Sequence, residues 1–391
     1  MATVILSAAR TPIGSFGGTL STVAAPKLGA TAIKAALERA GVTPDQVSEV
    51  VLGNVLTAGI GQAPARQAAL GAGIPSSVPC TTVGKVCGSG MKSVMLADQM
   101  IRCGDADIVV AGGQESMSMA PYVLDKARNG YRVGNGQIID SMMHDGLTDA
   151  YASSPMGNFA DQCAVDCEVP REAQDAFAIE SYRRAQGSIA EGRFRDEIVA
   201  VTIQDRKGET VVDTDEEPAK TNFDKIPTLR PAFTKEGTVT AANASKINDG
   251  AAALVLASEE KAAELGLKPM ARIIAQSSAA KDPQHFTTAP IDAIQRVLDK
   301  AGLTLNDIDL FEINEAFAVV ALASQKALGI PLEKLNVNGG AVALGHPIGA
   351  SGARILTTLL YAMKQRNAKR GLAAICIGGG EATAMIVEAV A

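Results

Sequence analysis

The hydrophobic and polar positions of this chain follow the same pattern twice. Residues 32–47 (AIKAALERAGVTPDQV) match residues 293–308 (AIQRVLDKAGLTLNDI) at a constant offset of 261. In both copies apolar side chains recur at helical spacing, and a glycine ends the period. The repeat therefore predicts one helix in each half of the chain, each followed by a new element.

Two further pairs of segments repeat between the halves. A short apolar strand ends in glycines at 105–113 and again at 372–380, and Ser-Gly opens an apolar helix at 89–90 and at 351–352. Strands that alternate with helices in this order predict parallel or mixed sheets covered by helices. We expect the two halves to stack as pseudo-twofold mates.

A long central segment has no counterpart in the second half. It contains one clear helical pattern, at 171–190, among many Met, Pro and Asp residues. We interpret 118–246 as an insertion that covers one face of the first half and shapes a ligand site, as covering loops often do. The first half then comprises 1–117 with 247–268, and the second half comprises 269–391.

Composition narrows the class of protein. Of 391 residues, 47% are apolar and 20% are charged, which indicates a folded chain of two or three domains. The net charge of -6 and the lack of a dense basic stretch argue against nucleic-acid binding. Aromatic residues make up 4%, without tryptophan, so a base-stacking platform is also disfavoured.

The compartment is suggested by the cysteines and the N-terminus. Six cysteines are too few for a disulfide scaffold in a chain of this length. The start, MATVILSAARTP, is typical of a strand and turn rather than a signal peptide, and no apolar run approaches the ~18 residues of a membrane span. We expect a reduced, cytoplasmic protein without membrane contact.

Four short turns carry the candidate chemistry: VCGSGM at 86–91, NEAF at 314–317, a glycine-rich stretch at 339–352, and CIGGG at 376–380. Ligands of α/β proteins bind at such strand ends. Cys87 precedes Gly-Ser-Gly and an apolar helix, a position where helix dipoles would favour its thiolate. A buried core cysteine is the alternative.

The other three turns contain ambiguous residues as well. Cys376 ends an apolar strand, and the glycines after it could offer N–H groups to an oxyanion; a buried strand cysteine is equally compatible. His346 lies in a tight Gly-His-Pro turn. It is a candidate for the chemistry, and a structural imidazole is the alternative. Asn314 could act in a site or, with Glu315, cap the next helix.

Taken in order, the four segments resemble those of the thiolase family, and the resemblance covers essentially the whole chain. It is nearest to the short-chain members that act on acetoacetyl-CoA. The family implies an α/β fold of two similar βαβαβαββ halves in five α-β-α-β-α layers, with a loop-rich insertion over the coenzyme A site. It also implies a dimer or, as we expect here, a homotetramer built as a dimer of dimers.

The resemblance implies a role for each turn. Cys87 would accept the acyl group, His346 would take its proton, and Cys376 would remove a proton from the acetyl-CoA methyl group. Asn314 would hold a water in one oxyanion hole. The N–H groups of Cys87 and Gly378 would form the second.

The expected activity is that of an acetyl-CoA C-acetyltransferase, whose partners are acetyl-CoA, acetoacetyl-CoA and coenzyme A. Thiolate attack on a thioester is nearly isoenergetic, so condensation and thiolysis would be reversible, with ping-pong kinetics through an acetyl-enzyme. Methyl deprotonation needs a base and donors at the enolate oxygen. Two cysteines and a histidine supply these groups without a metal or redox cofactor. A broader-chain 3-ketoacyl-CoA thiolase is the alternative.

Coenzyme A contacts are also implied by the resemblance. They are Ser245 at the pantetheine, Phe233 at the adenine, Lys220 near the phosphates, and the pocket residues Met156, Gly157, Ala316, Phe317 and Phe286. Ser245 could equally be a helix cap. Phe286 resembles the mitochondrial subgroup, in which potassium orders nearby loops, and suggests tolerance of a 2-methyl branch. The matching potassium positions are Tyr182, Ala241, Ala242, Ala244 and Val342.

Several positions depart from the family pattern and put coenzyme A affinity in doubt: Pro155, Pro218, Ala219, Lys246, Glu381 and Gly84. A decarboxylating ketosynthase would need a second histidine or an asparagine where Cys376 stands. A nicotinamide dehydrogenase would need G-x-G-x-x-G after the first strand, and a non-catalytic lipid-binding relative would lack Cys87 or His346. Cys163 and Cys167 could bind a metal with His144, but packed helix-face cysteines fit better.

Overall fold

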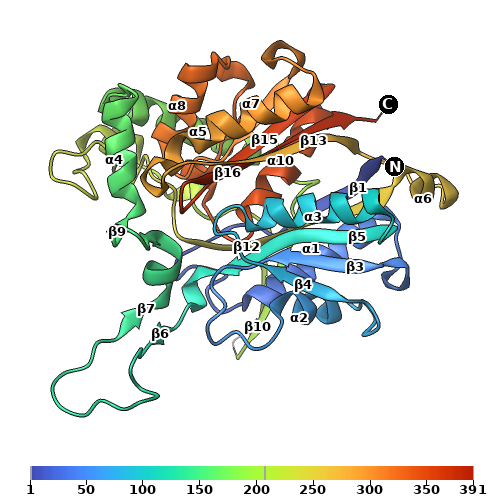
Figure 1. Ribbon diagram of the computed structural model, residues 1–391, viewed down its shortest axis with the longest axis horizontal. Coiled ribbons are helices and arrows are strands. Elements are labelled where there is room, and N and C mark those ends of the chain that lie inside the picture. The colour runs from blue at the N-terminus through green and yellow to red at the C-terminus, as the bar shows by residue number, and fades with distance from the viewer. Residues whose placement is uncertain (1, 207, 391) are drawn as a thin grey trace.

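The computed structural model of the protein describes residues 2–206 and 208–390 (Figure 1). The first half runs β1 (Thr3–Arg10), β2 (Gly14–Ser15), α1 (Ala25–Ala40), β3 (Glu49–Gly53), α2 (Pro64–Gly71), β4 (Cys80–Val83), α3 (Ser89–Cys103), β5 (Ile108–Ser116), β12 (Asn248–Ser258) and α6 (Glu259–Glu264). The second half runs β13 (Ala271–Ala280), α7 (Ala289–Ala301), β14 (Leu310–Ile313), α8 (Ala318–Leu328), α9 (Ala341–Leu344), α10 (Ser351–Arg366), β15 (Arg370–Ile377) and β16 (Glu381–Ala389).

The repeated sequence segments form equivalent elements, as predicted. α1 and α7 both end before a left-handed glycine, Gly41 at φ 68° and Gly302 at φ 66°. α3 begins at Ser89 and α10 at Ser351, the two Ser-Gly positions of the repeat. The apolar strands before the glycines form β5 and β15.

The strands join in the order β14-β15-β16-β13-β1-β12-β5-β3-β4, with β2 beside β12. The sheet is mixed, since β3 runs parallel to β4 and β5 whereas β12 is antiparallel to β1 and β5. A short pairing of Val4 and Ile5 with Arg272 and Ala271 links the two halves.

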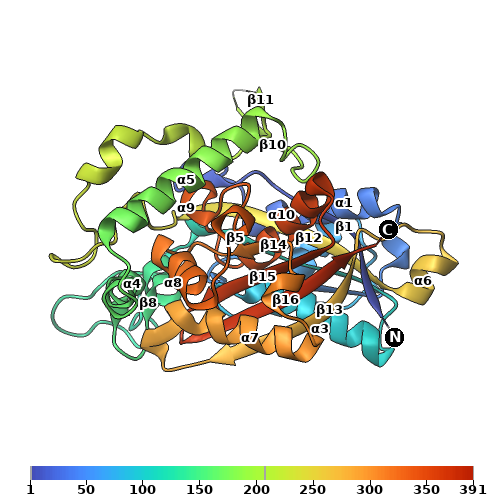
Figure 2. The same ribbon diagram turned by 90° about the horizontal axis from the view of Figure 1, so that it is seen from above.

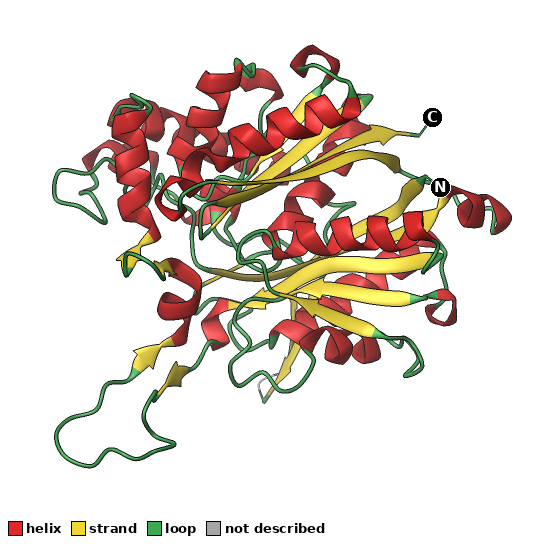
Figure 3. Cartoon of the chain, viewed as in Figure 1, coloured by secondary structure: helices red, strands yellow, loops and turns green. Residues whose placement is uncertain are grey.

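The layers follow the α-β-α-β-α arrangement that the resemblance implies. Away from the β1–β13 link, the two halves of the sheet separate, and α3 and α10 lie between them (Figures 1 and 3). Apolar side chains of α3 and α10 form one buried cluster with strands of both halves. α1 and α2 cover the outer face of the first half, and α7 and α8 cover that of the second.

The inserted segment leaves the core after β5 and returns as β12. It contains β6 (Tyr122–Val123), β7 (Ile139–Asp140), a π-helical turn (Met142–Leu147), β8 (Thr148–Asp149), β9 (Ser154–Pro155), α4 (Met156–Asp166), α5 (Arg171–Ala190), β10 (Val201–Asp205), β11 (Gly208–Val212), and two 3-10 turns (Pro218–Lys220 and Phe223–Thr228). α5 has the predicted bounds. The 3-10 turn Pro283–Thr288 precedes α7.

We expected the insertion to cover one face of the first half, but most of its helical contacts are with the second half. α4 and α5 pack on α8 of the second half, and α5 also packs on α9 (Figure 2). The β10–β11 hairpin does contact the first half, since Val201 and Val212 join its outer core. The insertion therefore packs on both halves, which the sequence repeat alone did not reveal.

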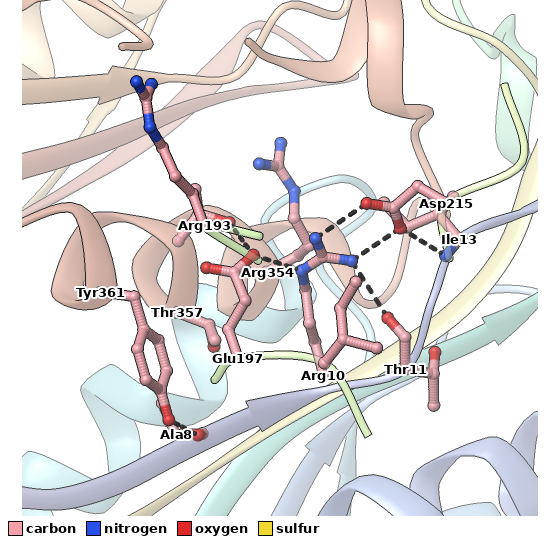
Figure 4. A network of polar contacts seen from close by, with 12 residues as sticks. Ala8, Arg10, Thr11, Ile13, Arg193, Glu197, Asp215, Arg354, Thr357 and Tyr361 are labelled. Atoms are coloured by element: carbon pink, nitrogen blue, oxygen red, sulfur yellow. Dashed lines mark hydrogen bonds and ion pairs between the residues drawn. The ribbon is translucent and has the colours of Figure 1, made fainter. Parts of the chain in front are cut away.

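A buried ion-pair network attaches the insertion to β1 (Figure 4). The Nε of Arg10 donates to Glu197 Oε1 at 2.6 Å, and its Nη1 and Nη2 donate to Asp215 at 2.7 and 2.9 Å. All three side chains are fully buried. Because each buried charge is paired, the network fixes the ends of the hairpin without leaving a lone ion in the core. Within the described residues, no helix combines the length and apolar character that crossing a membrane requires.

Candidate active site

Cys87 lies on a strained turn between β4 and α3. Val86 adopts φ 43°, a left-handed conformation that is unfavourable for a β-branched residue. Ser89 holds this turn: its Oγ donates to the Val86 carbonyl at 2.7 Å and accepts from the Lys85 N–H at 2.8 Å. The turn leaves Cys87 half-buried at its tip.

The environment of Cys87 does not favour its thiolate, contrary to the prediction from the helix position. Burial raises the pKa of the Cys87 thiol to about 11, and the charge of Glu115 acts in the same direction. The backbone N–H groups of Gly378 and Cys87 itself favour the thiolate, but burial outweighs them. Cys87 is therefore protonated at neutral pH and needs a base before it can attack.

His346 has the properties of such a base. Its Nδ1 lies 2.6 Å from Ser351 Oγ, and that hydroxyl also donates to the Pro347 carbonyl at 2.8 Å. We assign the Ser351 proton to the Pro347 carbonyl, which can only accept, so that Nδ1 donates to Ser351 Oγ. The lone pair is then on Nε2, which is buried and has no hydrogen-bond partner in the part of the chain that the structure describes.

The charge state of His346 agrees with this role. Burial, together with the nearby Arg354 guanidinium, lowers the pKa of the imidazole to about 3. The ring is thus neutral at physiological pH. The His346 backbone N–H donates to Asn248 Oδ1 at 2.9 Å, which holds the turn on β12. The structure therefore presents a neutral acceptor on a doubly anchored ring.

Cys376 lies at the end of β15, next to the Cys87 turn. A Cβ on Gly88 would stand 2.8 Å from Ile377 Cγ1, so the two turns are in direct contact. Burial raises the pKa of Cys376 well above its usual value, and the charge of Cys87 raises it further. The structure thus brings Cys87, Cys376 and the N–H of Gly378 together from opposite halves, as the sequence analysis expected.

Asn314 directly follows β14, and its side-chain amide makes no hydrogen bond to the described residues. Both its Nδ2 and its Oδ1 are buried without a hydrogen-bond partner among the described residues, and its backbone N–H donates to the Ala374 carbonyl at 2.9 Å. The capping alternative is wrong, since the N-cap of α8 is Phe317 and no side chain caps it. A buried amide left unpaired is costly, which indicates that a ligand or water completes it.

The Glu315 carboxylate, unlike the Asn314 amide, has its hydrogen-bond partners within the protein. It accepts from Ser181 Oγ at 2.7 Å, Asn336 Nδ2 at 2.8 Å and the Val342 N–H at 3.1 Å. These donors come from α5, the stretch after α8, and α9. Glu315 therefore serves to join the insertion to the second half beside Asn314.

Glu115, at the end of β5, was not recognised from the sequence. Its Oε1 accepts from Asn54 Nδ2 at 2.7 Å and the Leu56 N–H at 3.1 Å, and its Oε2 accepts from the N–H groups of Val55 and Gly349 at 2.9 Å. It thereby ties the first half to the His346 loop. A carboxylate at the end of an otherwise apolar strand was the signal that could have identified it.

Most of the expected acyl-pocket residues converge around Phe317. The ring of Phe286 lies edge-on to it, with the centroids 6.5 Å apart. So does the ring of Phe233 at 6.1 Å, although the resemblance implied a place for Phe233 at the adenine. A Cβ on Gly157 would collide with the Phe233 ring. Phe286, Phe317, Ala316 and Ala244 belong to the same apolar cluster as Cys376, and Met156 lies at its edge. The cluster therefore forms an apolar wall beside the second cysteine.

Ser245 is not a helix cap, since the chain leads from it into β12. Its backbone N–H donates to the Ala316 carbonyl at 3.0 Å, which attaches it to the Phe317 cluster. Lys220 is held elsewhere: its Nζ donates to Ser15 Oγ at 2.7 Å and to Glu216 Oε1 at 2.8 Å. Its charge is thus already paired with a carboxylate.

Two of the residues expected around potassium, Ala241 and Ala244, accept hydrogen bonds from the ammonium group of Lys246. Tyr182, Ala242 and Val342 pack in one apolar cluster. The carbonyls of Ala241 and Ala244 accept from Lys246 Nζ at 2.6 and 2.9 Å.

Cys163 in α4 and Cys167, the residue that follows α4, pack together with their sulfurs 3.8 Å apart. In residues 2–206 and 208–390, no three His, Cys, Asp or Glu side chains converge as metal ligands.

Comparison with known proteins shows the family to which this chain belongs. Residues 3–260 match the family model of the thiolase N-terminal domain, and residues 267–389 match that of the thiolase C-terminal domain. The acetyl-CoA acetyltransferase of Schizosaccharomyces pombe is 53% identical over 388 residues, which cover 99% of this chain and 98% of that protein. The acetyl-CoA acetyltransferase of Cupriavidus necator is 54% identical over 98% of both chains. Acetyl-CoA acetyltransferase 2 of Arabidopsis thaliana is 55% identical over 98% of this chain and 96% of that protein.

Proposed function

This chain belongs to the thiolase family and is an acyltransferase, and we propose that it is an acetyl-CoA C-acetyltransferase with Cys87 as nucleophile. It joins two acetyl-CoA molecules into acetoacetyl-CoA and coenzyme A, and it also catalyses the reverse thiolysis. The observation that carries the proposal is the approach of Cys87 to both Cys376 and the Gly378 N–H, with the His346 ring neutral and its Nε2 without a hydrogen-bond partner among the described residues.

The first half-reaction transfers the acetyl group to Cys87. His346 Nε2 takes the thiol proton as the Cys87 sulfur attacks the thioester carbonyl of acetyl-CoA. The new S–C bond forms and the bond to the coenzyme A sulfur breaks. Cys376 gives its proton to the departing coenzyme A thiolate, which leaves Cys376 as a thiolate beside the imidazolium. Its raised pKa makes this thiolate a strong base.

The second half-reaction forms the carbon–carbon bond. The Cys376 thiolate removes a methyl proton from a second acetyl-CoA, and the enolate oxygen is stabilised by the His346 imidazolium and by the water held at the Asn314 amide. The carbanion attacks the acetyl-Cys87 carbonyl, whose oxygen faces the N–H groups of Cys87 and Gly378. Cys87 leaves as a thiolate and recovers its proton from His346, so the cycle closes without net proton change.

The test combines turnover with mass measurement. Loss of acetoacetyl-CoA in the presence of free coenzyme A would be followed for the wild type, Cys87→Ala and Cys376→Ala. Intact mass would be recorded after acetyl-CoA alone. We expect thiolysis to be abolished in both variants and a single acetyl adduct to require Cys87. An adduct that persists in Cys87→Ala would refute the assignment of the nucleophile.

We further propose that the protein is a homotetramer. β4 forms the edge of the sheet with mostly half-buried residues, and such an edge is a template for pairing. The β6–β7 hairpin projects from the body (Figure 1); Tyr122 in β6 and Val133 and Ile138 in its loop are exposed. The molar mass of a variant lacking 125–137, measured by light scattering, tests this proposal. A dimeric variant would support two distinct interfaces, one of which needs the loop. A variant that is still a tetramer would exclude a role for the loop.

A further inference from the structure

Lys246 is bound in the way that a free cation would be. Its Nζ donates to the carbonyls of Ala241 and Ala244 at 2.6 and 2.9 Å, and it lies 5.7 Å from the centre of the Tyr182 ring. Backbone carbonyls and an aromatic face are ligands that suit a monovalent cation. Here they surround an ammonium group that the chain itself supplies.

The charged neighbours of Lys246 do not neutralise it directly. None of the ion pairs found among the described residues includes Lys246. The Glu217 carboxylate favours the ammonium from a distance, while Glu217 Oε1 itself accepts from Asn248 Nδ2 at 3.4 Å. Burial lowers the pKa of Lys246 to about 8. The carbonyls of Ala241 and Ala244 therefore provide its direct polar contacts.

The segment that Lys246 binds is attached to the site. Ala244 pairs with Phe317, the Ser245 N–H donates to the Ala316 carbonyl at 3.0 Å, and the Ala318 N–H donates to the Asn243 carbonyl at 2.8 Å. These bonds join the segment to the residues that directly follow Asn314 and Glu315. Holding the carbonyls of Ala241 and Ala244 in place therefore also positions Ser245 and the apolar cluster around Phe317.

We propose that the Lys246 ammonium is a built-in monovalent cation that orders the 241–245 segment and makes the enzyme independent of added potassium. It replaces the potassium activation that the resemblance implied for Tyr182, Ala241, Ala242, Ala244 and Val342. A second cation at these oxygens would lie beside the ammonium and be repelled by it. The link to coenzyme A binding rests on the proposed function.

Two substitutions at Lys246 separate charge from space. Lys246→Ala removes both and leaves the carbonyls open to a free cation, whereas Lys246→Met fills the space without a charge. Lys261→Ala is the control, because its ammonium is exposed on α6 and pairs with Glu264. Each would be assayed for kcat/KM toward coenzyme A in thiolysis, in sodium, potassium, ammonium and choline chloride at equal ionic strength.

We expect the wild type and Lys261→Ala to give the same kcat/KM in all four salts. Lys246→Ala should lose about tenfold or more in choline, since charge-assisted hydrogen bonds are lost, and recover in potassium or ammonium. Lys246→Met should show the loss without recovery. Potassium activation of the wild type, or a Lys246→Ala enzyme that no cation rescues, would overturn the proposal.

A second readout does not depend on turnover. The thermal unfolding midpoint of Lys246→Ala should rise with potassium concentration, as for any ligand that binds the native state, while those of the wild type and Lys246→Met should not. This result would support the cation site even if acetoacetyl-CoA proved not to be the substrate. If the thermal unfolding midpoint of Lys246→Ala does not change with potassium concentration, the cation site is refuted independently of the proposed function.

Discussion

Gly90 and Gly352 hold equivalent positions in the two halves, and each lies against the first turn of the other's helix. A Cβ on Gly90 would stand 2.8 Å from the Ala353 nitrogen, and one on Gly352 would collide with the Met91 nitrogen. Two helix starts can approach this closely only where side chains are absent. The glycine pair therefore brings the turns before α3 and α10, with Cys87 and His346, into one region.

Gly352→Ala should reduce both stability and activity. The added methyl group has backbone rather than a flexible side chain in its way, so overpacking should cost about 1–3 kcal/mol in the free energy of unfolding. Urea denaturation and the thiolysis assay would measure the two effects. Gly187→Ala on α5 is the control, because nothing lies within 4 Å of its added Cβ and a helical alanine should slightly stabilise the protein.

Alkylation of Cys87 should continue to accelerate with pH well above 8. Since burial raises the pKa of Cys87 to about 11, the thiolate fraction should grow almost tenfold per pH unit up to about 10. The rate of iodoacetamide labelling, read from peptide mass at Cys87, measures this. A plateau below pH 9 would instead support the thiolate that the helix position suggested.

The buried neutral imidazole of His346 should make the protein sensitive to acid. Its pKa is about 3 in the folded state and near 6.5 when unfolded, so between these values the unfolded chain binds a proton that the native state does not. Lowering the pH therefore favours unfolding, by about 1.4 kcal/mol per unit below 6.5. Urea denaturation at pH 7, 6 and 5 should show this slope reduced in His346→Asn; equal slopes would contradict the assignment.

Ser351→Ala should impair kcat more than KM. Ser351 Oγ accepts a hydrogen bond from the Nδ1–H of His346 and so keeps the lone pair on Nε2, but it acts through the imidazole. We expect a fall of about tenfold to a hundredfold in kcat, part of the contribution of a positioned base. Ser351→Thr, which retains the hydroxyl, should recover much of it. Equal losses in both variants would indicate packing rather than imidazole orientation.

Asp215→Ala should strongly destabilise the protein, because it leaves the Arg10 guanidinium buried with only Glu197 as a charged partner. Breaking a buried pair on one side costs about 3–5 kcal/mol. The triple variant Arg10→Met, Glu197→Leu and Asp215→Leu removes all three buried charges and should be less destabilised than the single variant. Urea denaturation of both measures the difference in the free energy of unfolding; a more damaged triple variant would contradict this account.

The sequence by itself determined the local elements and the identity of the reactive turns. Apolar spacing and a terminal glycine are local signals, so they located the ends of α1 and α7 and the bounds of α5. The motifs around Cys87, Asn314, His346 and Cys376 identified the family for the same reason. Each is a short run of residues whose chemistry and backbone needs can be read without knowing its neighbours in space.

Only the tertiary structure decided the charge states and the partners across the chain. The raised pKa of Cys87 depends on burial, which no local spacing encodes, and this reversed the expected effect of the helix start. The packing of α4 and α5 on the second half depends on side-chain contacts far apart in sequence. In the sequence, Lys246 was only a departure from the family pattern. Its role emerged because the fold placed its ammonium between the carbonyls of Ala241 and Ala244, and a long flexible side chain takes its position from such contacts.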